Sequence, residues 1–178
     1  MRPLQRTARP LLCAVGIVAA IVAGALTVLP WLDLSSSDGP FAWMGLGSDG
    51  GPQASHNSSI LDLNPLSWTV VAAAALTIIA AATAIAPTPR TTISLMNIAA
   101  ALSALVAAVV VVSIVCIPEL FYSDLAQKLG IESFTPFTRS TLSIPVLVAV
   151  GGALIVMIIC TGVLAVIRRP SRADATIR

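Results

Sequence analysis

The sequence has 178 residues, of which 57% are apolar and only 10% are charged. A soluble globular domain carries about 25% charged residues, so this composition excludes that class, and the length fits a single domain. The three cysteines and the one histidine lack the spacing of a disulfide framework or a metal site. The net charge of +2 says little by itself, because basic and acidic residues lie in different parts of the chain.

Four long apolar runs contain no Asp, Glu, Lys, Arg or His; they are residues 11–29, 68–86, 93–117 and 144–167. A helix needs about 20 apolar residues to cross a bilayer. Only helices and closed barrels satisfy their backbone polar groups in lipid, and these continuous runs lack the alternation of barrel strands. The sequence therefore predicts an all-α membrane protein, a single domain of four transmembrane helices.

The charged residues are sorted by position. Eight of the ten basic residues lie in residues 1–10, 87–90 and 168–178, whereas seven of the eight acidic residues lie in 30–67 and 118–143. Basic residues near the ends of spans stay on the cytoplasmic side. The pattern predicts a plasma-membrane protein with both termini in the cytoplasm and two extracytoplasmic loops. Three arginines should contact anionic lipid headgroups rather than nucleic acid: Arg168, Arg169 and Arg172.

Prolines mark the expected ends of helices. Residues 1–10 are expected to form a tail outside the first helix. Pro87 and Pro89 should end the second helix, because proline lacks a backbone donor, and Thr91 or Thr92 should cap the third. The basic start of the chain also fits a signal peptide, but the first apolar run is too long for one, so an uncleaved helix is expected.

The first loop, 30–67, contains several aromatic residues. Trp31 and Trp68 flank the loop and are expected to lie at the membrane interface, where tryptophan is favoured. Three apolar residues inside the loop either lie on that interface or contact a partner protein: Phe41, Trp43 and Met44. Both interpretations of this cluster stay open.

The second loop, 118–143, contains an apolar residue at every fourth position: Phe121, Leu125 and Leu129. This spacing predicts a short amphipathic helix. Its apolar face would lie on the outer leaflet or pack on the first loop, and these side chains are a second candidate for partner contact.

The spans contain no residue for acid–base chemistry. Ionisable side chains inside a membrane are costly and are usually kept for function, so their absence argues against a proton relay, a charged-substrate transporter or an ion-coupled carrier. No enzymatic activity is expected. Asn97 is the most polar side chain near a span and is expected to form an interhelical hydrogen bond. No cofactor and no metal ion are expected.

Small residues recur at helical spacing within the spans. The most specific set is Gly16, Ala20 and Gly24 in the first run, and similar sets are Ala100, Ala104 and Ala108 in the third run and Gly151 and Gly152 in the fourth. Small residues at this spacing let helix backbones approach closely. Leucine at Gly16 or Gly24 should therefore weaken packing, whether the close approach lies inside the bundle or against a partner.

These features favour a non-enzymatic membrane protein that serves as an accessory or assembly subunit of a larger envelope complex. Its expected partners are membrane lipids and either another membrane protein or further copies of itself. The alternative function is a small self-assembled pore, holin or permease for uncharged solutes, because apolar spans can line only a narrow path.

Overall fold

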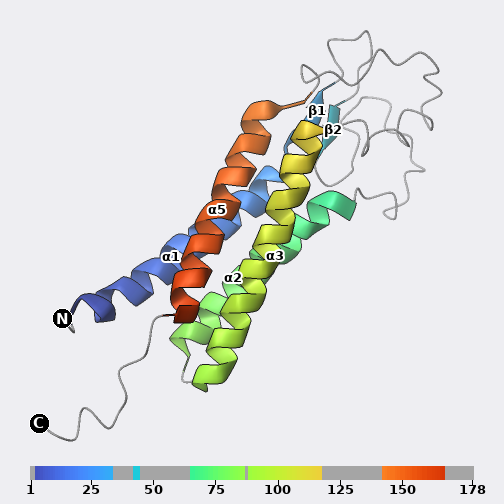
Figure 1. Cartoon of the computed structure of the whole chain (residues 1–178). Coiled ribbons are helices and arrows are strands. Elements are labelled where there is room, and N and C mark those ends of the chain that lie inside the picture. The colour runs from blue at the N-terminus through green and yellow to red at the C-terminus, as the bar shows by residue number, and fades with distance from the viewer. Residues whose placement is uncertain (1–2, 34–41, 45–64, 87, 118–141, 167–178) are drawn as a thin grey trace, which may run out of the picture.

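The computed structural model describes residues 3–33, 42–44, 65–86, 88–117 and 142–166 (Figure 1). Within these residues the chain forms four long helices: α1 (Pro3–Leu26), α2 (Pro65–Ile85), α3 (Arg90–Cys116) and α5 (Ile144–Val166). All four are long and apolar enough to cross a membrane, which confirms the prediction of four long apolar helices.

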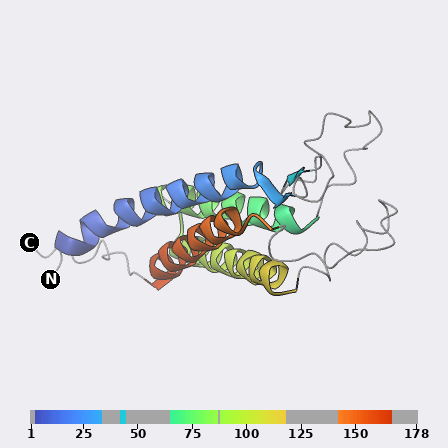
Figure 2. The same ribbon diagram turned by 90° about the horizontal axis from the view of Figure 1, so that it is seen from above.

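The helices form an antiparallel bundle. Each packs against two neighbours, in the cyclic order α1, α2, α3, α5, and α2 also touches α5 across the bundle. The end where α1 begins, α2 turns into α3 and α5 stops is called the terminal end, and the opposite end, which carries the strands, is called the loop end (Figures 1 and 2). Sequential neighbours along the chain are therefore also neighbours in space.

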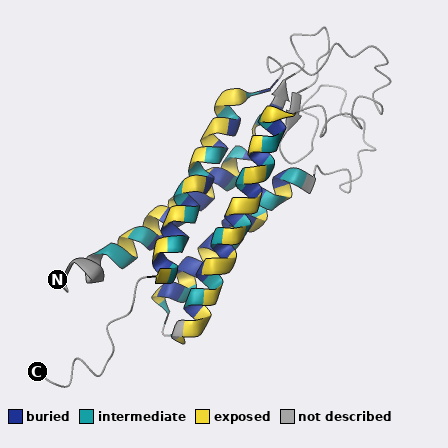
Figure 3. Ribbon diagram, in the orientation of Figure 1, coloured by how far each residue is buried: buried dark blue, intermediate teal, exposed yellow. Residues whose placement is uncertain are grey.

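Buried residues follow a heptad spacing. On α3 they are separated by alternating steps of four and three residues: Ile93, Asn97, Ala100, Ala104, Ala107, Val111 and Ile114. A stripe of this period faces its neighbours continuously when helices cross at about 20°. The stripes turn inward and the exposed residues turn outward (Figure 3).

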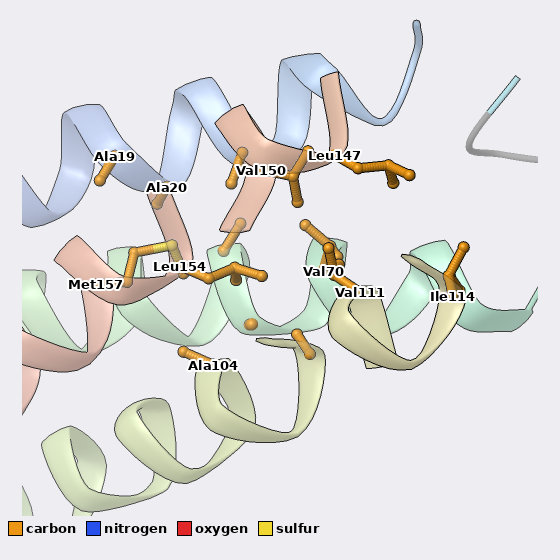
Figure 4. Close-up of a cluster of buried hydrophobic side chains, with 14 of the residues drawn as sticks. Ala19, Ala20, Val70, Ala104, Val111, Ile114, Leu147, Val150, Leu154 and Met157 are labelled. Carbon is orange, nitrogen blue, oxygen red and sulfur yellow. The ribbon is translucent and has the colours of Figure 1, made fainter. Parts of the chain in front are cut away.

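In the middle of the core, large residues of α5 pack against small residues of the other helices, and Val70, Val111 and Ile114 join them toward the loop end. α5 contributes Leu147, Leu154 and Met157, all at most 1% exposed, while α1 and α3 face them with alanines such as Ala20 and Ala104 (Figure 4). Small residues on three helices let the backbones approach, and the larger side chains of α5 fill the space between them.

The ends of α1 differ from the prediction. The helix begins at Pro3 and continues through Pro10, so the expectation of a separate tail over residues 1–10 is wrong for residues 3–10. At the other end it stops at Leu26, not Leu29, because the next three amide groups bond to carbonyls three residues back, as in a tightened final turn. Pro30 then follows, and it has no amide hydrogen to continue the pattern.

The ends of α2 and α3 also shift. α2 begins at Pro65, where a fixed φ and a missing donor suit the first helical position. α3 begins at Arg90 after an N-cap residue, Pro89, that makes no side-chain cap hydrogen bond. The expected caps Thr91 and Thr92 lie inside the first turn instead, because the fixed backbone of Pro89 already sets the entry into the helix.

A small antiparallel sheet interrupts the all-helical pattern. β1 (Pro30–Asp33) pairs with β2 (Ala42–Met44), so Trp43 and Met44 lie in a strand. Trp31 on β1 is fully buried, and its indole Nε1 donates a hydrogen bond to the Leu26 carbonyl at 3.2 Å. The interpretation of Trp31 as an interface residue is therefore wrong: a bent chain after α1 turns its ring into the core.

The same strand anchors the start of the last helix. The Ser143 amide donates to the Trp31 carbonyl at 3.0 Å, and Leu142 is buried beside the bundle. The Ser143 carbonyl in turn accepts the amides of Val146 and Leu147 in the first turn of α5. The loop end is thus tied together by backbone hydrogen bonds between segments that are far apart in sequence.

Candidate functional site

The predicted small-residue set of α1 divides between two environments. Gly16 and Ala20 are buried, whereas Gly24 is only partly buried. A β-carbon built on Gly16 would lie 3.5 Å from Cβ of Cys160 and 3.8 Å from Cγ2 of Thr77, but one built on Gly24 would meet no atom within 4 Å. α1 therefore approaches α2 and α5 closely at Gly16. After Ala20, the next buried position on this helix is Ala23 rather than Gly24.

The sets on α3 and α5 divide in the same way. Ala100 and Ala104 are fully buried, while Ala108 is partly exposed, and the fully buried residue of that turn is its neighbour Ala107. On α5, Gly151 is partly exposed and Gly152 is exposed, and a β-carbon at either would meet no atom within 4 Å. The two glycines therefore lie away from the core of this chain.

Several buried residues with hydrogen-bonding side chains lie at one level of the bundle beside a glycine, and we call this level the polar layer: Gly16, Thr77, Asn97, Cys160 and Thr161. Apart from Gly16, which supplies no side chain, each is at most 4% exposed. At 1.5 Å rise per residue, the four side chains lie roughly 8–12 Å from the terminal ends of their helices. Gly16 lies roughly 20 Å from Pro3, because α1 begins further out, but its β-carbon position lies beside Cys160 and Thr77 and so at the same level. Among the described residues, the buried polar residues Thr77, Asn97 and Thr161 thus lie at one depth, while Thr27 and Ser67 are buried toward the loop end.

The polar layer separates two apolar clusters. Toward the terminal end lies a cluster that includes Cys13, Ala84, Ile93 and Leu164. Toward the loop end lies the larger cluster of Figure 4, whose nearest members include Ala20 and Met157. The order along each helix places the polar layer between the two clusters, so apolar side chains lie on both sides of it.

The hydrogen bonds of the layer return to the helices that carry them. Thr77 Oγ1 donates to the Ala73 carbonyl at 2.9 Å, and Thr161 Oγ1 donates to the Met157 carbonyl at 2.7 Å. Asn97 Nδ2 donates to the carbonyl of Ile93 at 2.8 Å. The expected interhelical bond from Asn97 is therefore absent among the described residues, because the amide nitrogen reaches one turn back along α3.

The chemistry of the layer is limited to hydrogen bonding. It holds hydroxyl, amide and thiol groups, and the described parts of the four helices bring no carboxylate, imidazole or ammonium group to it. Nor do those parts contain a group of three or more His, Cys, Asp or Glu residues able to hold a metal ion. The groups of this layer can donate and accept hydrogen bonds, and the Cys160 thiol is its titratable group.

The polar layer could have been predicted by counting how many residues separate each polar side chain from the end of its apolar run. Asn97 was the only member that the sequence singled out for a polar contact, and its depth from the end of α3 matches that of Thr77 and Thr161 on their helices. The signal was missed because threonine is common in membrane helices and bonds to its own backbone.

The remaining predicted contact residues are less fully described. Trp43 and Met44 lie in β2, where only their backbone is described. The other predicted partner residues and the headgroup arginines lie outside the described residues: Phe41, Phe121, Leu125, Leu129, Arg168, Arg169 and Arg172. The predicted amphipathic helix of the second loop lies outside them as well.

No model of a known protein family matches the chain, and neither does any curated protein or solved structure with which it was compared. The fold itself defines the class: a four-helix bundle whose helices have the length and hydropathy of membrane spans.

Proposed function

We propose that the protein is a non-enzymatic multi-pass protein of the plasma membrane, with both termini in the cytoplasm. It would serve as an accessory or assembly subunit that binds a transmembrane helix of a larger membrane complex. The observation that carries this proposal is an exposed patch of small residues on α5, which we call the α5 patch: Pro145, Ala149 and Gly152.

The α5 patch lies on the outward face of its helix, toward the loop end. All three residues are exposed, and a β-carbon on Gly152 would meet no atom of the bundle within 4 Å. In lipid, association of helices depends on close packing, which small residues permit. The outward face of α3 carries large side chains such as Leu102 and Val109, each 57% exposed, whereas the comparable large side chain of α5 in this region, Val148, lies beside the patch. α5 thus offers a second helix a closer approach than α3 does.

The interior of the bundle supports an assembly role over transport. Leu154 and Met157 are fully buried at its centre, and the polar layer is enclosed by apolar clusters on both sides. A pore or permease path would therefore have to run between copies of the chain. The described residues offer no polar outward face that would line such a path, because the exposed side chains of the four helices are predominantly apolar.

Cross-linking within the membrane tests the proposal. A photoreactive residue at Val148, which is 64% exposed beside the patch, should give one discrete adduct in intact cells. The same probe at Val109 on α3 should give lipid adducts only. Mass analysis of the adduct distinguishes a different membrane protein, as proposed, from a second copy of this chain, which would replace the proposal by self-association.

Two leucine variants provide the matched comparison. Gly152→Leu should abolish the Val148 adduct without lowering stability, because the added side chain meets nothing in the bundle. Gly162→Leu is the control: it also meets no atom within 4 Å, but it lies near the other end of α5. An adduct that survives Gly152→Leu, or one that is lost equally in Gly162→Leu, would contradict docking at the α5 patch.

A further inference from the structure

Asn97 carries a buried acceptor that lacks a donor. The residue is 0% exposed, and its Nδ2 is used in the bond to the Ile93 carbonyl. Its Oδ1 accepts no hydrogen bond from any residue that the structure describes. A buried carbonyl oxygen without a donor lowers stability, and native proteins rarely leave one unsatisfied. Asn97 Oδ1 therefore needs a hydrogen-bond donor at this level of the bundle.

The hydroxyl groups of the polar layer do not supply this donor. A hydroxyl has one hydrogen and two lone pairs. The hydrogens of Thr77 and Thr161 are already directed at the carbonyls of Ala73 and Met157. Both hydroxyl oxygens can still accept a hydrogen bond. The layer thus has three oxygens that can accept a further hydrogen bond: Asn97 Oδ1 and the two hydroxyl oxygens. Its remaining donors are the second Nδ2 hydrogen of Asn97 itself and the weakly donating Cys160 thiol.

The core side chains of α5 in the polar layer are smaller than those on either side of it, which favours an additional small molecule at this level. On either side of the layer, α5 contributes a large residue to the core, Met157 toward the loop end and Leu164 toward the terminal end. Within the layer α5 contributes only Cys160 and Thr161, and the facing residue of α1 is Gly16. The β-carbon position of Gly16 has only ordinary van der Waals neighbours, so even an added methyl group would be accommodated there.

We infer that the polar layer binds one buried water molecule, which donates one hydrogen to Asn97 Oδ1 and the other to a hydroxyl oxygen of Thr77 or Thr161. Water brings two donor hydrogens in a small volume, which is what a layer rich in acceptors and poor in donors requires. Buried waters typically bridge polar groups that have no other partner. The apolar clusters on both sides make this an enclosed structural site rather than a conducting path.

Solid-state NMR of the full chain in lipid bilayers tests this inference. The protein is labelled with ¹³C-asparagine and ¹³C-methionine, and magnetisation is transferred from water protons to carbon. The Asn97 Cγ signal, assigned by its loss in Asn97→Gln, should receive magnetisation from water. The Met157 methyl carbon, fully buried in the apolar cluster, is the dry control. An Asn97 signal as dry as that of Met157 would overturn the inference and assign the donor to the Cys160 thiol.

A pair of isosteric variants tests the bridging arrangement. The double variant Thr77→Val and Thr161→Val keeps Asn97 but removes both hydroxyl acceptors, so the transfer from water to Asn97 Cγ should be lost. Thr83→Val is the matched control, because Thr83 also bonds to its own helix, at the Ala80 carbonyl, but lies outside the layer. Transfer that persists in the double variant would overturn the bridge between Asn97 and the threonines.

Discussion

Replacing Gly16 by leucine tests how α1 packs against α2 and α5. The β-carbon of the new side chain would lie 3.5 Å from Cβ of Cys160 and 3.8 Å from Cγ2 of Thr77. Both are ordinary contact distances, so alanine fits this position. Leucine adds three further carbons beyond the β-carbon, and these must enter space that Cys160 and Thr77 already occupy.

The expected magnitude follows from two opposing terms. Overpacking a core costs about 1–3 kcal/mol, and leucine recovers roughly 0.8 kcal/mol relative to glycine through its higher helix propensity. We therefore expect Gly16→Leu to lower the free energy of unfolding by about 0.2–2 kcal/mol. Gly16→Ala should raise it by about 0.5–1 kcal/mol, because alanine gains the propensity without a clash.

Gly24→Leu is the decisive comparison within the same helix. The sequence spacing predicts that it disturbs packing as Gly16→Leu does, but the structure places no atom within 4 Å of a β-carbon at Gly24. We expect its stability to be unchanged or up to about 0.8 kcal/mol higher.

Unfolding in mixed micelles, followed by helical circular dichroism as denaturing detergent is added, measures all three variants against the wild type. The packing argument would be refuted by a Gly16→Leu variant as stable as the wild type. It would also be refuted by equal losses for Gly16→Leu and Gly24→Leu.

Two further predictions concern topology and the loop end. In a variant without native cysteines, a membrane-impermeant maleimide should label a cysteine at Gln127 in intact cells but not one at Thr88; labelling at Thr88 would reverse the proposed orientation. Trp31→Phe removes the indole hydrogen bond to the Leu26 carbonyl and should lower the free energy of unfolding by about 1 kcal/mol, whereas Trp68→Phe, at a residue 47% exposed, should change it little. Equal effects in the same micelle unfolding assay would contradict the buried role of Trp31.

The ends of the helices were only partly predictable. Prolines placed the α2–α3 turn correctly, because a missing donor acts locally whatever surrounds it. The entry to α3 was not predicted, since Pro89 rather than a threonine occupies the cap position. Trp31 was misplaced for a related reason. One tightened turn after Leu26 and the pairing of β1 with β2 direct its ring inward, and strand pairing depends on residues distant in the chain.

The sequence by itself determined the four spans. Length and hydropathy are properties of each segment alone, and a bilayer admits only a helix or a barrel strand at those lengths. Likewise, the absence of ionisable residues from the spans is a property of composition that no packing arrangement can change.

The inward face of each helix was decided only by the tertiary structure. In a soluble bundle the outward face is polar and reveals the core by contrast, but a membrane helix is apolar on all sides. Spacing therefore could not separate Ala107 from Ala108, or Ala23 from Gly24, and it grouped the outward Gly152 with the inward Gly16. Those choices arise from how four helices fit together, since in lipid close packing rather than polarity selects the buried face.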